Sequence, residues 1–163
     1  MNADAFRHLY GYQFAENRKV WDHVMSLSYE LFKQPVDYSH GPVRDQIVHL
    51  KDAEDVWFSE LRGTNPSDPI PPADFDDREL IGTHWDKVEQ GMRAYLAELQ
   101  DEMLFTKPIT DPEDDKVLFV WQVLLHVVNH ATDHRAQLLR LLNDLGVKTS
   151  YQDYIFYVYE NVI

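Results

Sequence analysis

Histidines at helical spacing are the residues of this chain best suited to chemistry. Among eight histidines, His130 and His134 stand four residues apart in a stretch with helical periodicity. Their side chains would lie on one face of a helix, one turn and ~6 Å apart along its axis. Two imidazoles so placed can bind one metal ion. His126 extends the row, but it would lie ~12 Å from His134 along the axis, so one ion cannot bind all three.

The third ligand of such a site must come from another element, and two histidines are candidates. His49 lies at the edge of the apolar stripe of a second predicted helix, where it can point between helices, as metal ligands of bundles do. His84 lies beside Trp85 on a third predicted helix and is the competing candidate. The remaining histidines belong to no such group and are expected to be solvated: His8, His23 and His40.

Several other kinds of site are excluded by missing residues. The chain has no cysteine, which excludes a disulfide scaffold, a thiolate metal site and a cysteine nucleophile. Ala131 occupies the place of the glutamate in the H-E-x-x-H motif of metalloproteases. No glutamate stands three residues before a histidine, as di-iron carboxylate bundles require. The sequence also has no G-x-S-x-G, P-loop or G-x-G-x-x-G motif.

The charge balance excludes two classes of partner. Lys and Arg total 15 against 28 Asp and Glu, for a net charge of −13, and no basic patch is present. Such a field repels nucleic-acid phosphates and anionic membranes. No apolar run approaches the ~20 residues that span a bilayer, and the first residues lack the layout of a signal peptide. We therefore expect a cytoplasmic protein that binds neither nucleic acid nor membrane.

Apolar residues recur at helical spacing through the first part of the chain. The pattern predicts one helix over residues 5–32 and a second that starts at Pro42 and ends at Gly63. Residues 64–74 hold four of the eight prolines and show no periodicity, so they are expected to form a long crossover loop between helices.

The second part of the chain continues the helical pattern. Asp74 is the predicted N-cap of a third helix, whose apolar face runs from Ile81 to Leu99. A turn or short hairpin is expected between Phe105 and Val117, followed by a fourth helix from about Leu118 to Leu145. The run Ser150–Asp153 approximates a capping box and predicts the start of a short final helix.

Four long amphipathic helices with one extended crossover predict an all-α fold. The expected architecture is a four-helix bundle with a long crossover loop and a short C-terminal helix. The length of 163 residues fits one domain that comprises residues 1–163.

The histidine-bearing segments resemble those of a known family. The run from Leu125 to Leu139 is similar to the last bundle helix of the DinB-like (damage-inducible, YfiT-related) family, where an asparagine-histidine step leads to a second histidine followed by arginine, a small residue and glutamine. Gln46–Leu50 resembles the ligand segment of the family's second helix, and Tyr151–Tyr154 resembles its closing helix. The resemblance extends from Tyr12 to Glu160 and departs at Ala136, where the family usually carries glycine.

The resemblance implies a bundle with one metal ion held by three histidines. By position these are His49, His130 and His134, and His126 and His84 become neighbours or packing residues. Three neutral nitrogen ligands leave coordination positions open for water or substrate. Nitrogen ligation indicates a divalent ion, and we expect zinc or nickel, with iron as the next alternative.

Family members with known activity are thiol-dependent transferases and isomerases that use bacillithiol, mycothiol or glutathione. The resemblance therefore implies an S-transferase-type enzyme that acts on a small-molecule substrate with a low-molecular-weight thiol. Since the chain lacks cysteine, the thiol must arrive with the cofactor. Arg135 and Lys51 are candidate anion-binding neighbours for a carboxylate-bearing thiol, with ordinary surface charges as the alternative.

Two other functions use the same histidines. One is a non-catalytic metal-binding bundle that forms a homodimer and serves in a stress response. The other is a metal-dependent hydrolase, in which the ion activates water. Hydrolysis needs a general base, and Asp133 would lie about 100° around the helix from its neighbouring ligand. Glu54 is the other candidate base. A homodimer is the expected assembly.

Overall fold

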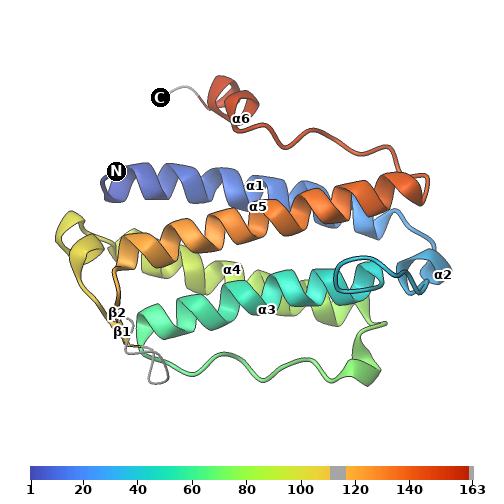
Figure 1. Cartoon of the computed structure of the whole chain (residues 1–163), viewed down its shortest axis with the longest axis horizontal. Helices are drawn as coiled ribbons and strands as arrows, with labels where there is room; N and C mark the ends of the chain where they lie inside the picture. The colour runs from blue at the N-terminus through green and yellow to red at the C-terminus, as the bar shows by residue number, and fades with distance from the viewer. Residues whose placement is uncertain (111–116, 162–163) are drawn as a thin grey trace.

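The computed structural model describes residues 1–110 and 117–161, which are mostly helical with two short strands (Figure 1). Four long helices form the bundle: α1 (Ala3–Met25), α3 (Val43–Arg62), α4 (Arg78–Glu98) and α5 (Val120–Asp144). The shorter elements are α2 (Tyr29–Phe32), η1 (Pro72–Asp74), η2 (Asp101–Phe105), β1 (Ile109–Thr110), β2 (Val117–Leu118) and α6 (Tyr154–Glu160). The predicted all-α four-helix bundle is confirmed.

Each long helix packs against two neighbours, so the core lies along the axis of the bundle. α5 contacts α1 and α3, and α4 contacts the same two helices from the other side. Leu124, Ala131 and Leu138 repeat every seven residues on α5, and all three are fully buried. This spacing keeps one stripe of α5 against the core. Within the described residues, no helix has the length and hydropathy needed to cross a membrane.

The first predicted helix is two helices, which corrects the expected range 5–32. α1 ends at Met25 because the Ser26 hydroxyl donates a hydrogen bond to the carbonyl of His23 (2.7 Å). α2 then starts anew, with the Ser28 side chain accepting from the backbone N–H of Leu31 (3.3 Å). Serine hydroxyls compete with helical hydrogen bonds, so two serines close together interrupt a helix that the apolar pattern would continue.

α3 has the predicted bounds, whereas α4 starts later than expected. Gly63 ends α3 in the left-handed conformation (φ 66°), which glycine adopts without strain. The N-cap of α4 is Asp77, whose side chain accepts from the N–H of Leu80 (2.9 Å). Asp74, the predicted cap, ends the short helix η1, which begins at Pro72 after a second proline.

The crossover loop of residues 64–74 is present and is attached to α3. The N–H of Ser67 donates to Asp55 Oδ2 (2.8 Å), and Ile70 is buried in the core. The expected short hairpin is formed by β1 and β2, which pair antiparallel with Ile109 opposite Leu118. The part of that prediction between residues 111 and 116 lies outside the described residues.

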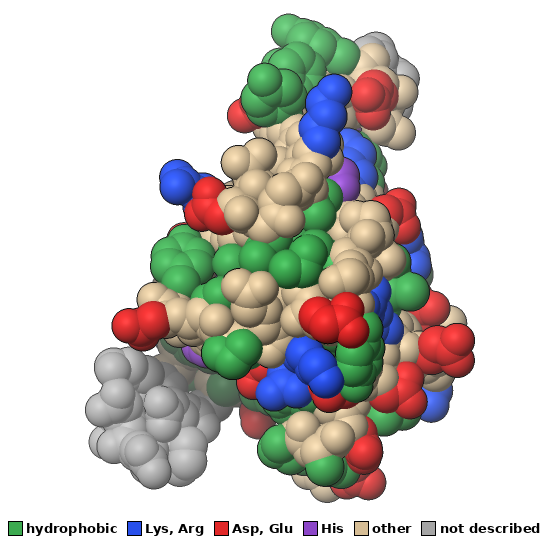
Figure 2. Space-filling model, turned by 90° about the vertical axis from the view of Figure 1, so that its right-hand side faces the viewer, with side chains coloured by type: hydrophobic (Ala, Val, Ile, Leu, Met, Phe, Trp, Pro, Cys, Tyr) green, Lys and Arg blue, Asp and Glu red, His purple; other side chains and the backbone are tan. Residues whose placement is uncertain are grey.

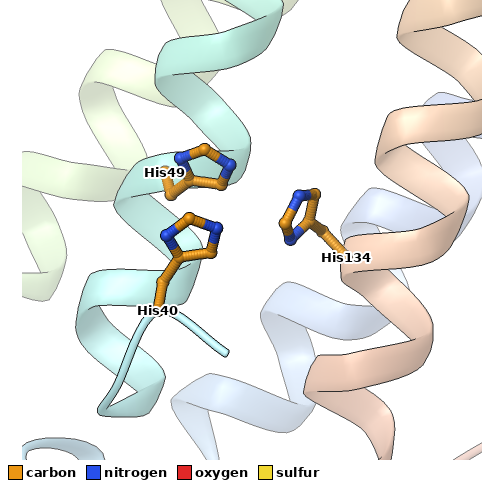
Figure 3. A group of neighbouring side chains, drawn as sticks. All are labelled: His40, His49 and His134. Carbon is orange, nitrogen blue, oxygen red and sulfur yellow. The ribbon is translucent and has the colours of Figure 1, made fainter. Parts of the chain in front are cut away.

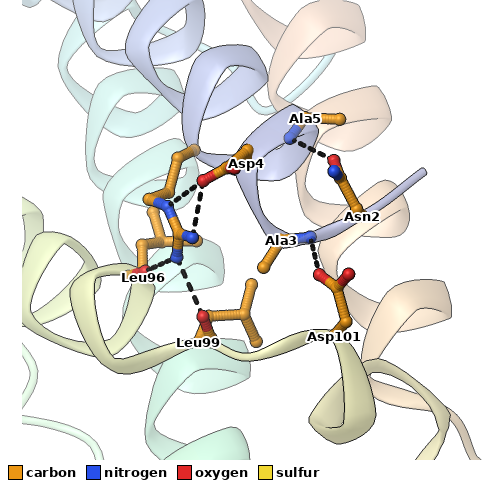
Figure 4. A network of polar contacts seen from close by, with 8 residues as sticks. Asn2, Ala3, Asp4, Ala5, Leu96, Leu99 and Asp101 are labelled. Carbon is orange, nitrogen blue, oxygen red and sulfur yellow. Dashed lines mark hydrogen bonds and ion pairs between the residues drawn. The ribbon is translucent and has the colours of Figure 1, made fainter.

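The start of α1 is attached to the end of α4, as Figure 4 shows. Arg7 Nη1 donates to the carbonyls of Leu96 and Leu99, both at 2.9 Å. The N–H of Ala3 donates to Asp101 Oδ1 (2.7 Å). Because the last carbonyls of a helix have no partner within it, the Arg7 guanidinium caps α4 and fixes its position along α1.

The final helix starts at Tyr154, four residues after the predicted Ser150. The residues before it are held by α1 and α5 in a non-helical path. The N–H of Ser150 donates to His23 Nε2 (3.3 Å), and the Tyr12 hydroxyl donates to the carbonyl of Gln152. These bonds to other elements replace the predicted capping box.

Candidate metal centre

Three histidine side chains from three elements meet beside α3 and α5, as Figure 3 shows. His49 comes from α3, His134 from α5, and His40 from the segment between α2 and α3. Each offers a ring nitrogen, and these nitrogens lie within 4.8 Å of one another. The ring centroids are 3.7 Å apart for His40 and His49, 4.6 Å for His49 and His134, and 5.1 Å for His40 and His134.

The helix packing explains why His49 and His134 meet. His134 follows the buried Ala131 by three residues and precedes the buried Leu138 by four, so it belongs to the α5 stripe that faces the core. His49 is half-buried between the buried residues Val48 and Leu50 on α3. Because α3 and α5 pack directly against each other, both imidazoles point into the same interhelical space.

His130, the third predicted ligand, lies beside this group. It is half-buried, and its ring centroid is 4.3 Å from that of His134 and 5.3 Å from that of His49. The structure therefore brings together all three residues that the sequence singles out. Their action as metal ligands stays a prediction.

The sequence predicts that His40 is solvated and belongs to no group of histidines. The prediction that it belongs to no group is wrong. Its side chain is exposed, but its ring stacks on that of His49 with an interplanar angle of 18°. The apolar residues of the segment that carries His40 have no regular spacing, so the sequence does not predict where its side chain lies. The one available signal is its distance from His49, only nine residues, with the helix start at Pro42 between them.

The remaining histidines lie elsewhere. His126 is exposed and packs edge-on against Trp57, with ring centroids 4.9 Å apart. His84 is half-buried on α4, outside the group. His8 and His23 are less solvated than expected, because both are half-buried against the C-terminal segment. His8 packs on Tyr154 and Tyr157, and His23 bonds to Ser150. They are structural contacts of that segment.

The clustered imidazoles are held neutral. Burial, followed by the neighbouring histidines, lowers the pKa of His49 and of His130 to about 4. Burial and His40 lower the pKa of His134 in the same direction. At pH 7 these rings carry no proton that a metal ion would have to displace.

The buried Nδ1 of His134 tests whether these residues fit a metal ion. It has no hydrogen-bond partner among residues 1–110 and 117–161. Buried polar atoms without a partner are rare in folded proteins and require an explanation. A divalent ion bound by nitrogen atoms supplies one, and an all-imidazole donor set suits zinc, nickel and ferrous iron. The residues present therefore fit the ion that the resemblance implies.

Arg135 and Lys51 are buried, so the interpretation of these residues as surface charges is wrong. Arg135 is fully buried and donates to Asn17 Oδ1 (2.8 Å) and Thr132 Oγ1 (3.1 Å), with a longer bond to Gln152 Oε1. Lys51 is 1% exposed, and its Nζ lies 2.5 Å from Asp52 Oδ1. The guanidinium of Arg135 links α5 to α1 and to the C-terminal segment.

The two candidate bases for hydrolysis are engaged elsewhere. Glu54 is buried and accepts hydrogen bonds from Gln13 and Asn17 of α1 and from Trp85 of α4. Burial raises the pKa of its carboxyl group, although these three hydrogen bonds oppose the rise. Asp133 is exposed and accepts from Gln137 Nε2 (3.0 Å). Neither carboxylate belongs to the histidine group.

Comparisons with known proteins agree with the helical-bundle fold and match this chain over nearly its whole length. The DinB family model matches residues 1–161. The chain belongs to the DinB family. Protein DinB of Bacillus subtilis (strain 168) is 22% identical over 166 residues, which cover 98% of this chain and 96% of that protein. The crystal structure of a DinB-like protein from Bacillus cereus ATCC 10987 matches with a TM-score of 0.71 and 19% identity, over 92% of this chain and 97% of the other. The DinB resemblance seen in the sequence is confirmed.

Proposed function

We propose that this DinB-family protein binds one divalent metal ion through His49, His130 and His134 and works as a thiol-dependent transferase. The arrangement of the histidines carries the proposal. His49 of α3 and His134 of α5 belong to one group of ring nitrogens, His130 lies beside both rings, and the buried Nδ1 of His134 has no partner within the described chain. Zinc or nickel is the proposed ion, with iron as the alternative, because these ions accept nitrogen ligands.

The proposed chemistry divides between the ion, the cofactor and the chain. A bound divalent ion supplies a positive charge that lowers the pKa of a coordinated thiol and holds it as thiolate. The protein has no sulfur nucleophile of its own, because it lacks cysteine. A low-molecular-weight thiol would therefore provide the nucleophile. The task of His49 and His130 is to present neutral nitrogen atoms at pH 7, and three protein ligands leave a position open for the thiol.

A groove beside the histidines suits a small substrate. It has a volume of about 220 Å³ and is lined by Trp57, Leu118, Gln122, Val123 and His126. The ring centroid of His126, which lines the groove, is 5.7 Å from that of His130. Ligand pockets are typically ~300–1,000 Å³, so this groove fits only a small electrophile or the apolar part of one.

A homodimer is part of the proposal. Large apolar side chains of the C-terminal segment are exposed, and Figure 2 shows them gathered at the top of the molecule. They are Tyr151, Tyr154, Ile155, Phe156 and Tyr159. Contiguous exposed apolar surface marks interaction sites, and a second copy of the chain would cover it. Light scattering on the wild type and on F156S tests this; an F156S protein that is as dimeric as the wild type would argue against α6 as the interface.

The non-catalytic alternative is favoured by His40. His40 lies against His49 on one side, and His130 lies beside His49 and His134. Four imidazoles are therefore candidate ligands, and four protein ligands are typical of structural metal sites rather than catalytic ones. In that case the protein would bind metal, dimerise and show no turnover.

Metal analysis followed by a conjugation assay tests the proposed function. Protein purified without a histidine tag or chelator is expected to carry about one divalent ion per chain. The metallated protein is then mixed with an electrophile and one thiol at a time from a panel. At least one thiol should react above background, and H130A should not accelerate it. Background rates with every thiol would favour the non-catalytic alternative, and a chain that binds no divalent ion would reject both.

A further inference from the structure

His40 sits on a segment that two other elements hold in place. Ser39, the residue before it, has a backbone φ of 51°, and Gly41, the residue after it, has a φ of 89°. The first of these is in the left-handed region that non-glycine residues rarely adopt. Such a conformation persists when surrounding contacts enforce it. The backbone therefore turns sharply on both sides of His40.

The contacts that enforce this turn come from the same helices that carry the metal-centre histidines. The Ser39 hydroxyl bonds to Gln137 Oε1 of α5. Gln46 Nε2 of α3 donates to the carbonyl of Gly41 (2.6 Å). His40 is thus tethered on one side to the helix of His134 and on the other to the helix of His49.

The side chain that results is placed like a ligand. Its nitrogen lies within 4.8 Å of ring nitrogens of both His49 and His134. Nitrogens 2.0–2.1 Å from a tetrahedral ion are ~3.4 Å apart, so the nitrogen spacing would have to change by no more than about 1–1.5 Å. Because the His40 ring stacks on that of His49, one of the two rings would also have to turn for both nitrogens to face the same ion. The burial is also graded: His134 is buried, His49 is half-buried and His40 is exposed.

We propose that His40 is a loop-borne ligand of the metal ion, added to the ligands that α3 and α5 provide. This inference rests on the proposed function, because it needs the ion. With His40, four imidazoles would be available to the ion; without it, three would remain and one position would be open. His40 is the exposed member of the group, so it would be the ligand that a thiol arriving from solvent replaces. The tethers at Ser39 and Gly41 set how readily this exchange takes place.

Cobalt(II) is the probe for the test, because its visible spectrum reports coordination number and donor type. The metal-free wild type, H40A and H84A are each titrated with Co²⁺. The wild type and the H84A control should give the intense bands of four-coordinate cobalt, and H40A should give the weaker bands of a higher coordination number completed by water. The affinity of H40A should fall at least about tenfold, since even residues that only support a ligand are typically worth about 10–100-fold.

The outcomes separate this inference from the proposed function. If the wild type binds no Co²⁺, the proposed function fails and the inference fails with it. If the wild type binds Co²⁺ and H40A gives the same spectrum and affinity, only the role of His40 is overturned. If H130A keeps the wild-type spectrum while H40A loses it, His40 is a ligand and His130 is not.

A second variant keeps His40 and loosens the loop. S39G removes the tether to Gln137 and relieves the left-handed strain at that position. 2-Mercaptoethanol is titrated into the cobalt proteins while the sulfur-to-cobalt charge-transfer band is followed. Half-saturation should come at several-fold lower thiol concentration in S39G than in the wild type, and lower still in H40A. Equal thiol affinity in all three proteins would overturn the proposed exchange.

Discussion

His134 and Arg135 are neighbours on α5, and both are buried, but their polar atoms have opposite surroundings. Each of the three guanidinium nitrogens of Arg135 donates to a side chain, on α1, on α5 itself and on the C-terminal segment. The Nδ1 of His134 has no partner among the described residues. The two side chains leave the helix about 100° apart, one toward α1 and the other toward α3. A satisfied buried network stabilises the fold, whereas an unsatisfied buried nitrogen is available for a ligand.

The largest effect on stability is expected at Arg135. R135A leaves Asn17 and Gln152 without their donor and opens a cavity between α1 and α5. The free energy of unfolding should fall by about 3–5 kcal/mol, as for other buried charged groups that lose a partner. Urea denaturation measures this. The folded fraction should still bind metal.

Arg140 provides the control on the same helix, because it is exposed and pairs only with Asp144. R140A should leave the free energy of unfolding almost unchanged. Equal destabilisation by the two alanine variants would show that Arg135 does not hold the bundle together.

His134 should show the reverse pattern. H134A is expected to weaken metal binding by at least about 100-fold, because it removes a ligand rather than a supporting residue. The free energy of unfolding of the metal-free chain should change by only about 1 kcal/mol, since no hydrogen-bond partner of Nδ1 is left unpaired. Chelator competition and urea denaturation measure the two quantities. H126A is the matched control and should keep its metal; equal metal loss in both variants would contradict the distinction.

Acid should destabilise the metal-free protein through the histidine group. The pKa of His49 and of His130 is about 4 in the folded chain, whereas an unfolded histidine has a pKa of about 6.5. Between these values the unfolded chain binds more protons, so the free energy of unfolding falls as the pH drops from 6.5 toward 4. Above pH 6.5 these groups have no effect.

Glu54 works in the opposite direction, because its pKa is raised in the folded chain. The informative quantity is therefore the difference between proteins. Urea denaturation at pH 7, 6 and 5 should show a flatter pH dependence for the H49Q/H130Q double variant than for the wild type. Parallel curves would mean that the two imidazoles are as readily protonated in the fold as in the unfolded chain.

The smallest effect is expected from one bond of the satisfied network. Trp85 Nε1 donates to Glu54 Oε2 at 2.8 Å. W85F keeps an aromatic ring and removes this donor, so it should cost about 1–2 kcal/mol in the free energy of unfolding. Metal affinity should stay unchanged, since neither Trp85 nor Glu54 belongs to the histidine group. A change in metal affinity would indicate that the two regions are coupled.

The sequence was sufficient for features that depend on local periodicity. Helical spacing predicted α3 and α5, and the interval of four residues placed His130 beside His134. It could not predict interactions made between distant segments. His40 lies on a segment without periodicity, and its place depends on bonds to Gln137 and Gln46. The burial of Arg135 depends on Asn17, which is 118 residues away. Helical spacing therefore left open whether Arg135 is an anion-binding neighbour or a surface charge, and it did not predict a buried network.

The end of the first predicted helix and the start of α4 were predicted wrongly for a related reason. An apolar stripe reports which residues face the core, but capping hydrogen bonds decide where a helix stops. Ser26 and Ser28 ended α1 inside a continuous stripe, and Asp77 rather than Asp74 capped α4. Each position offered more than one capping residue, and the tertiary structure selected among them.

The long interval between α1 and α5 also affects how the chain folds during synthesis. Tyr10 donates to the carbonyl of Leu124, and Arg135 donates to Asn17, across 114 and 118 residues. Contacts between residues so far apart in the sequence slow the folding of helical proteins. Residues 49 and 134 are 85 positions apart, and translation at about 5–20 residues per second needs ~4–17 s to cover that interval. The nascent chain thus carries His49 for seconds before its partner helix exists, so the histidine group cannot assemble until α5 is complete.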